Sequence, residues 1–153
     1  MKLTSGKINL FNLFKLPAAY FTGVRVKYID DIKCVVSVKH RWVNQNPFKS
    51  MFWAVQGMAA ELTTGALVLG KIKSSGQNIS MLVANNNATF TKKATGRITF
   101  ECTQGQDIDK AVKNAIDTGE GQSVWLNSKG INKEGIQVSE FNFEWTLKVK
   151  SKK

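Results

Sequence analysis

One carboxylate, Glu61, stands inside a long apolar stretch, and its setting favours chemistry more than that of any other residue in the chain. The stretch is NPFKSMFWAVQGMAAELTTGALVLG, from Asn46 to Gly70. A charged group in a buried helix is costly unless it is paired, hydrogen-bonded, protonated or turned toward a wet cleft. Burial raises the pKa of a carboxyl, and such a group can act as a general base toward water. Gly57 and Gly65, each one turn away, either leave room beside Glu61 or allow close packing.

The other residues with chemical potential favour structural roles. His40 is the only histidine, and it shares strand parity with Val38 and Trp42, which is typical of a structural residue. Cys34 and Cys102 lie far apart within predicted strands, and neither has metal-ligand spacing around it. We therefore expect buried free thiols and no disulfide, zinc site or other metal site.

The net charge of +11 raises the question of nucleic-acid binding. The positive residues are spread along the chain, apart from Lys92-Lys93 and a tail from Lys148 to Lys153. We interpret the excess as solubility and a solvated tail, and we expect no nucleic-acid partner. A phosphorylated small ligand needs only a few such cations.

The bulk composition predicts a single domain spanning residues 1–153. Apolar residues make up 42% of the chain and charged residues 22%, which excludes a disordered protein. No apolar run is long enough to span a bilayer, and no clean signal-peptide core is present, so we expect a cytoplasmic protein. Residues 1–22 predict a helical segment packed on the domain, with Pro17 ending or bending a short amphipathic helix over 7–21.

The stretch around Glu61 predicts one long helix. Asn46 before a proline suits its start, and Gly70 suits its end. Because apolar residues cover nearly all of its sides, the helix should be buried in the centre of the molecule.

The remaining elements predict strands with one small helix inserted. Alternation predicts a hairpin over 24–28 and 34–42, a strand over 98–102 and a final strand over 141–149 with one buried and one solvated face. The nearly continuous apolar run 79–84 predicts a central strand covered on both faces, and Asn85-Asn86-Asn87 predicts a turn or bulge after it. A short helix is expected over 107–117, a strand over 123–128 and a turn over 130–135. Together these elements predict an α+β fold in which a mostly antiparallel sheet wraps around one long central helix.

This order of elements resembles the hotdog fold of the thioesterase-like superfamily, from about Gly23 onward. The local resemblance lies in Ser50-Met51-Phe52, in the Ala60-Glu61 pair, and in Phe90 followed by Lys92, Lys93 and Gly96. In that superfamily, a helix ending in Ala-Asp or Ala-Glu after a His-Gly-Gly opening supplies the acid or base. The chain looks most like a thioesterase-like branch known as a domain of unknown function.

The resemblance implies an acyl-CoA thioesterase in which Glu61 is the general base and coenzyme A is part of the substrate, with no further cofactor. It also implies a homodimer or a dimer of dimers, joined edge to edge with the clefts at the junction. Lys92 or Lys93 would meet the phosphates of coenzyme A. The candidate substrate-binding residues are Asn44, Asn46, Ser50, Phe52, Trp53, Ala54, Gln56, Gly57, Met58, Lys92 and Lys93.

One departure from the family pattern leaves a second function open. The positions of His-Gly-Gly fall on Phe52, Trp53 and Ala54, and a Trp in place of Gly fills space needed by a thioester carbonyl. The alternative is a non-catalytic acyl or lipid binder that has lost the oxyanion site. A second register, with Gly57 at the acidic position and Glu61 one turn further on, loses the Ala-Glu pair.

Overall fold

The structure is a computed structural model that describes residues 3–151. Residues 1–2, the first of the predicted N-terminal segment, and residues 152–153, the last of the basic tail, lie outside the described residues. The elements in chain order are α1 (Ser5–Lys15), α2 (Pro17–Phe21), β1 (Arg25–Ile29), β2 (Cys34–Lys39), the 3-10 turn η1 (Trp42–Asn44), α3 (Trp53–Ser75), β3 (Ile79–Phe90), β4 (Arg97–Cys102), α4 (Gly105–Thr118), β5 (Gln122–Ile131) and β6 (Gln137–Val149).

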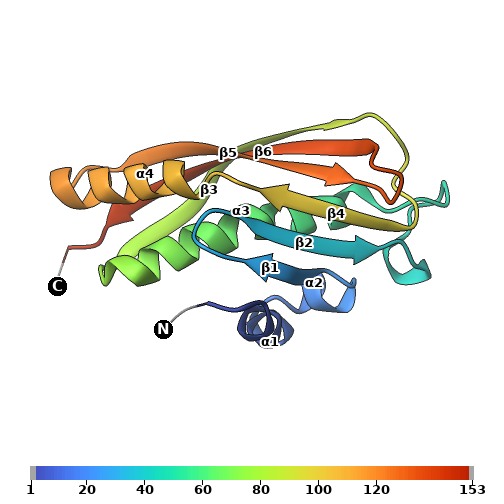
Figure 1. Ribbon diagram of the computed structural model, residues 1–153, viewed down its shortest axis with the longest axis horizontal. Helices are drawn as coiled ribbons and strands as arrows, with labels where there is room; N and C mark the ends of the chain where they lie inside the picture. The colour runs from blue at the N-terminus through green and yellow to red at the C-terminus, as the bar shows by residue number, and fades with distance from the viewer. Residues whose placement is uncertain (1–2, 152–153) are drawn as a thin grey trace.

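The strands form one sheet in the order β1-β2-β4-β5-β6-β3, and every neighbouring pair is antiparallel. The sheet curves around α3, while α4 lies beside β5 and β6 at one end (Figure 1). The predicted α+β architecture, a mostly antiparallel sheet wrapped around one long helix, is therefore confirmed.

The central helix is buried as predicted, but its predicted bounds are wrong. Asn46 accepts hydrogen bonds from the backbone N–H groups of Phe48 (2.9 Å) and Ser50 (3.2 Å), and Lys49 adopts a left-handed conformation with φ 58°. This side-chain-stabilised turn competes with a helix, so α3 begins only at Trp53. It continues past Gly70 and ends where Gly76 takes the left-handed conformation.

The prediction of a central strand over 79–84 is wrong. This run begins β3, which is an edge strand of the sheet. β3 pairs only with β6 among the described strands, and Leu82 is 66% exposed. The run is apolar because Met81 and Val83 pack against the core while Leu82 faces outward. The asparagines that follow continue the strand without a turn, and the shift in register between Val83 and Asn85 agrees with the predicted alternative, a bulge.

The hairpin of β1 and β2 is confirmed, but β2 ends before His40. Trp42 therefore has no strand parity with Val38; it opens η1 and is 84% exposed. Cys34 and Cys102 lie opposite each other on β2 and β4, and both are buried free thiols, as predicted.

The last strand supplies the aromatic wall that packs on α3. The side chains of β6 alternate as predicted, with Phe141, Phe143 and Trp145 on the buried face. The predicted turn over 130–135 starts too early, because Gly130 belongs to β5. A Cβ atom there would lie 2.6 Å from the Phe100 ring, so glycine lets β5 pass close to that side chain.

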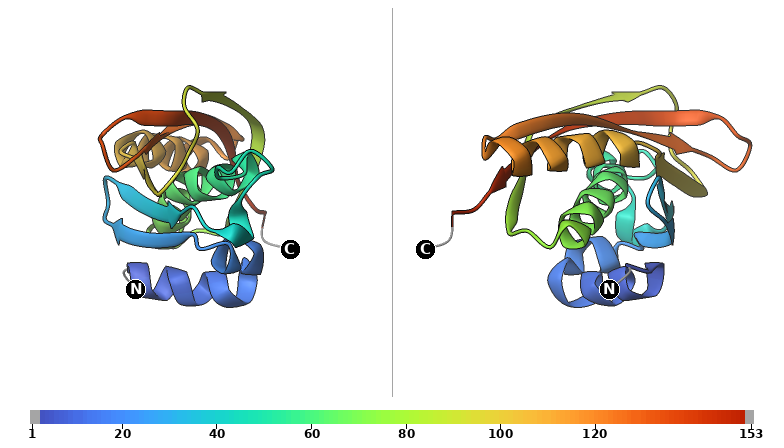
Figure 2. Two further views of the ribbon diagram at one scale, coloured as in Figure 1. Left: turned by 90° about the vertical axis from the view of Figure 1, so that its right-hand side faces the viewer. Right: turned by 60° about the vertical axis from the view of Figure 1, so that its left-hand side comes forward.

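The N-terminal segment forms two helices that cover α3 and one edge of the sheet. Pro17 separates them and begins α2, in agreement with its predicted role. The amide of Asn9 donates to Val26 O (2.9 Å) and accepts from Val26 N (2.8 Å), which pairs the outer edge of β1 as another strand would. α3 consequently lies between the long β5–β6 hairpin and the α1–α2 segment (Figure 2).

Candidate functional site

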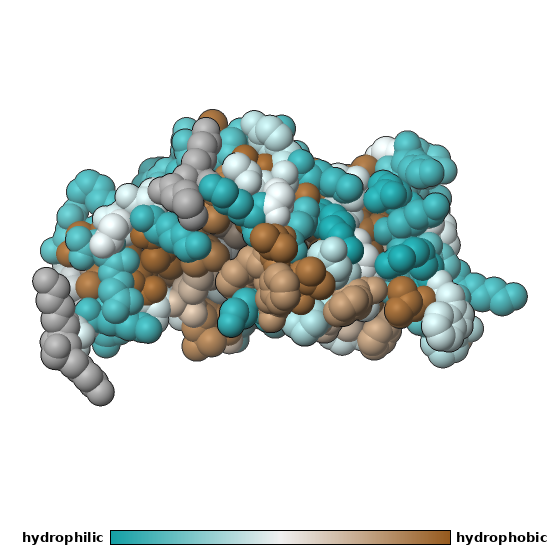
Figure 3. Space-filling view, turned by 90° about the horizontal axis from the view of Figure 1, so that it is seen from below, coloured by the Kyte–Doolittle hydropathy of each residue, from teal (hydrophilic) through white to brown (hydrophobic). Residues whose placement is uncertain are grey.

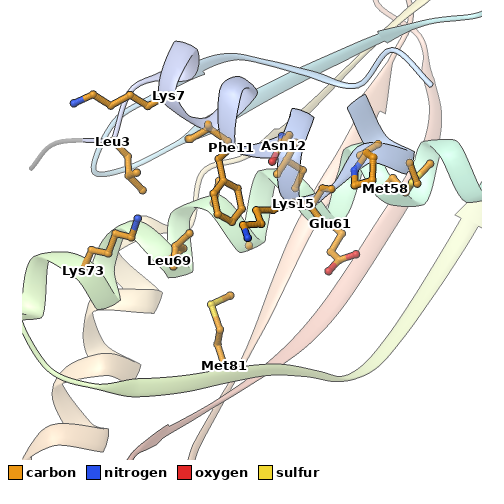
Figure 4. A pocket seen from close by; sticks show the side chains of 18 of the residues that line it. Leu3, Lys7, Phe11, Asn12, Lys15, Met58, Glu61, Leu69, Lys73 and Met81 are labelled. Carbon is orange, nitrogen blue, oxygen red and sulfur yellow. The ribbon is translucent and has the colours of Figure 1, made fainter. Parts of the chain in front are cut away.

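A cavity of about 660 Å³ lies between the α1–α2 segment and α3. Strands β3 and β6 close its inner side (Figure 4). Its walls are mostly aliphatic, aromatic and thioether side chains. The lining residues are Leu3, Lys7, Ile8, Phe11, Asn12, Lys15, Leu16, Pro17, Ala18, Ala19, Met58, Glu61, Leu62, Gly65, Ala66, Leu69, Lys73, Met81 and Trp145. A cavity of this size and character is typical of a site for a small organic ligand with a large apolar part.

Glu61 lies on the wall that α3 contributes to the cavity. Within residues 3–151, its carboxylate has no hydrogen-bond partner and no ion-pair partner. Glu61 is exposed to solvent on one side. The apolar groups on the other side raise the pKa of its carboxyl above the ordinary value of 4.5, because desolvation penalises the charged form. Of the settings that the sequence left open for Glu61, the structure shows a carboxyl that borders a cavity and has no partner among the described residues.

The wall next to Glu61 is fixed by a buried hydrogen-bonded pair. The indole Nε1 of Trp145 donates to Thr64 Oγ1 (2.9 Å), and that hydroxyl donates to the backbone oxygen of Glu61 (2.8 Å). A Cβ atom on Gly65 would lie 3.2 Å from the Trp145 ring. Gly65 thus serves close packing, and it also borders the cavity.

Asn12 is a polar residue of the cavity wall that the sequence did not single out. It lies on α1, its side chain is buried, and neither amide atom has a hydrogen-bond partner in the part of the chain that the structure describes. A buried amide without a partner lowers stability by about 1–3 kcal/mol. Such a group is usually explained by a function or by an unseen partner.

Three lysines also border the cavity, and the sequence had not indicated them. Lys15 and Lys73 extend toward the cavity from α1 and α3, whereas Lys7 points away from it (Figure 4). They lie in separate elements, so no spacing pattern in the sequence connects them. Together they place positive charge at the border of an otherwise apolar cavity.

Of the predicted substrate-binding residues, Met58 lines this cavity together with Glu61. Gly57 lies one turn earlier and faces the Phe141 ring, whose Cε1 would be 3.5 Å from an added Cβ atom. Gln56 is buried, and its Oε1 has no partner among the residues that the structure covers. Neither Gly57 nor Gln56 borders the cavity.

The polar residues before α3 that were predicted to bind substrate are hydrogen-bonded to other groups of the protein. Asn44 donates to Thr22 O and Lys39 O and accepts from Arg41 N, so it holds η1 in place. Asn46 and Ser50 are hydrogen-bonded to each other in the turn before the helix. The structure does not bring these three residues together with Glu61.

The predicted oxyanion positions form the start of α3. Phe52 is the residue before the first turn, and Trp53 and Ala54 begin the helix. Trp53 is 57% exposed, so in this chain its side chain lies in solvent. Eight positions separate Trp53 from Glu61, a distance of roughly 12 Å along a helix.

Lys92 and Lys93 lie near this start of α3 and away from the cavity. They are exposed in the segment after β3, and the next residue, Ala94, accepts a hydrogen bond from Met51 N (2.8 Å). The predicted site residues therefore fall into two groups, one around Glu61 and one at the start of the helix.

Solved structures of other proteins share this architecture. A protein of unknown function from Pseudomonas aeruginosa, described as a probable thioesterase, aligns with a TM-score of 0.85 and 20% identity over 98% of this chain and 99% of that one. A protein of unknown function from Chlorobaculum tepidum aligns with a TM-score of 0.82 and 16% identity, over 97% and 99%. A thioesterase from Haemophilus influenzae aligns with a TM-score of 0.71 and 12% identity, over 97% and 93%. A comparison with curated protein sequences found no match.

The fold is therefore the hotdog fold. Residues 6–147 match the family described as Domain of unknown function (DUF4442), and the chain belongs to that family. The resemblance that the sequence indicated is confirmed. Among residues 3–151, no helix has the length and apolarity needed to cross a membrane.

The raised pKa of Glu61 predicts a specific dependence of stability on pH. Because the folded state holds this proton more tightly than the unfolded state, the carboxyl lowers stability as pH rises from the ordinary value of 4.5 to the raised pKa. Urea unfolding of the parent and of Glu61→Gln across this range should show the variant gaining relative stability with pH and then levelling off. An NMR titration that places the pKa of Glu61 at or below 4.5 would contradict this account.

Proposed function

We propose that the protein hydrolyses acyl-CoA thioesters, with the acyl chain in the cavity and Glu61 as the general base. The supporting observation is a carboxyl with a raised pKa on the wall of an apolar cavity, without a partner in the described part of the chain. An apolar cavity suits an acyl chain, and a carboxylate with a raised pKa suits proton abstraction from water. The cytoplasmic location expected from the sequence remains part of this proposal.

In the proposed reaction, the Glu61 carboxylate accepts a proton from a water molecule while the water oxygen attacks the thioester carbonyl carbon. The carbon–sulfur bond then breaks, and Glu61 gives the proton to the leaving thiolate, which restores the carboxylate. The products are a carboxylic acid and free coenzyme A. Neighbouring apolar side chains such as Met58 and Trp145 keep the dielectric low around the reacting atoms.

The proposed active form is a homodimer joined along β3, by itself or within a dimer of dimers. The outer edge of β3 has no paired strand among the described residues, and the strand is 12 residues long, which suits edge-to-edge pairing. The need to polarise the thioester carbonyl also favours an active site that contains a second copy of the chain. Because the first amides of α3 lie roughly 12 Å from Glu61 of the same chain, such amides would have to come from another helix end.

The second candidate function is acyl or lipid binding without hydrolysis. The observation that favours it is the sequence Phe52-Trp53-Ala54 at the start of α3, where the superfamily has His-Gly-Gly. An oxyanion site made of backbone amides needs close approach of the substrate carbonyl, and Trp53 makes that approach harder. Tight binding of acyl-CoA with no release of thiol for any chain length would establish this alternative.

Replacing Glu61 tests the proposed base. Glu61→Gln should lower kcat for acyl-CoA hydrolysis by roughly 100-fold or more. Release of free thiol, measured with short, medium and long acyl chains, gives the rate. In the parent, kcat should rise with pH through the raised pKa and then level off, because only the ionised carboxylate is a base.

Glu134→Gln is the matched control, because Glu134 is exposed in the turn between β5 and β6. It should leave kcat and its pH profile unchanged. If Glu61→Gln hydrolyses every substrate as fast as the parent, Glu61 is not the base.

The lysines at the cavity border should bind the phosphates of coenzyme A. Replacing Lys15 and Lys73 together with Ala should raise KM for acyl-CoA by about tenfold, the effect of two modest charge-assisted contacts. KM for an acyl N-acetylcysteamine thioester, which lacks the nucleotide, should not change. The control replaces Lys92 and Lys93 together with Ala; if that pair carries the effect instead, coenzyme A enters beside the start of α3.

We expect Asn12 to contact the substrate and to lower the stability of the folded protein. Asn12→Leu should raise the free energy of unfolding by about 1 kcal/mol or more, because it removes a buried amide without partners. The same change should lower kcat/KM for acyl-CoA. Urea unfolding and the thiol assay measure the two effects.

Asn9→Leu on the same helix is the control for Asn12. It should lower stability, because it leaves the N–H and O of Val26 unpaired. An Asn12→Leu variant that is less stable than the parent and equally active would assign Asn12 a purely structural role.

A further inference from the structure

The outer face of α1 and α2 carries large apolar side chains that no described element covers. Leu10 is 60% exposed, Phe14 is 72% exposed and Phe21 is 64% exposed. Figure 3 views the molecule from the side on which α1 lies and shows apolar residues gathered in a band across this face. Contiguous apolar surface of this kind marks an interaction site in a soluble chain.

The apolar outer face is not needed for the packing of α1. Ile8 and Asn12 are the buried residues of this helix, and they face the protein interior. Leu10 and Phe14 are four positions apart, so they share one side of the helix, and neither lines the cavity. α1 is therefore apolar on an inner side that packs and on an outer side that does not.

The segment that carries this face is positively charged. Residues 1–29 contain no Asp or Glu, and their cationic residues are Lys2, Lys7, Lys15, Arg25 and Lys27. Among these, Lys7, Lys15 and Lys27 are exposed. Exposed Leu and Phe side chains flanked by lysines are typical of a helix that lies in the interface of an anionic membrane.

We propose that α1 and α2 dock on the surface of an anionic lipid bilayer, with Leu10, Phe14 and Phe21 inserted among the lipid headgroups. A second copy of the chain is a poorer occupant, because a symmetric contact through this face would bring the same cationic residues into opposition. α1 also packs on β1, at the other end of the strand order from the open edge of β3.

Docking in this orientation would bring the cavity close to the bilayer. The cavity lies directly behind α1, and Phe11 and Lys15 of this helix belong to its wall. An acyl compound could then pass between the lipid phase and the cavity over a short path. The docking proposal holds whether or not Glu61 is a general base, and its test does not depend on hydrolysis.

The test is co-sedimentation of the full chain with phosphatidylcholine vesicles, with and without phosphatidylglycerol. The parent should bind the anionic vesicles, and binding should weaken with added salt and in neutral vesicles. Replacing Leu10 and Phe14 together with Ser should reduce the fraction bound by about tenfold or more, because both side chains lose their contact with the lipid. The control replaces Trp125 and Ile136 with Ser; these are exposed on β5 and the β5–β6 turn, and their loss should not change binding.

Two results would overturn the proposal: the parent fails to bind anionic vesicles, or the Leu10/Phe14 variant binds them as well as the parent. If the parent fails to bind and the variant changes the oligomeric state, measured by analytical ultracentrifugation, the face is an interface between copies. Both substitutions are at exposed positions, so circular dichroism should show an intact fold in the variant.

Discussion

The site depends on one electrostatic constraint: Glu61 lies on an apolar helix, and no cation of residues 3–151 neutralises it. Its carboxylate is accessible on one side and partly desolvated by the cavity walls on the other, so its pKa is raised and its charged form is less stable than in water. A nearby lysine in contact would remove this effect. Lys15 and Lys73 border the same cavity, but neither forms an ion pair with Glu61 in the structure. Under the proposed function, Glu61 is then free to accept a proton, and the two lysines are free to bind an anionic part of the substrate.

The fold maintains this arrangement through packing on both sides of α3. On the inner side, Trp145 is held by its hydrogen bond to Thr64, and Gly65 allows its ring to lie against the helix. On the outer side, Asn9 ties α1 to β1, so α1 covers α3 without filling the space beside Glu61. The cavity is therefore a consequence of where α1 is anchored. The same anchoring leaves the other side of α1 facing solvent, and this connects the cavity with the apolar surface proposed to meet lipid.

Patterns within one element were predictable from the sequence, and arrangements between elements were not. The alternation in β6 identified its buried face, because it reflects one local periodicity. The start of α3 was missed because the Asn46 side chain stabilises a competing turn. β3 looked central because its outward-facing Leu82 is as apolar as its core residues. Glu61 was identified by its residue type, but Asn12, Lys15 and Lys73 join it only through the tertiary fold.

The central claim is that an acyl chain occupies the cavity with its thioester beside Glu61. A crystal structure of the protein with a non-hydrolysable thioether analogue of a long-chain acyl-CoA tests this most directly. The account predicts that the alkyl chain lies between Phe11 and Trp145, with the sulfur next to the Glu61 carboxyl and the nucleotide toward Lys15 and Lys73. An analogue bound elsewhere, with the cavity beside Glu61 left empty, would contradict it.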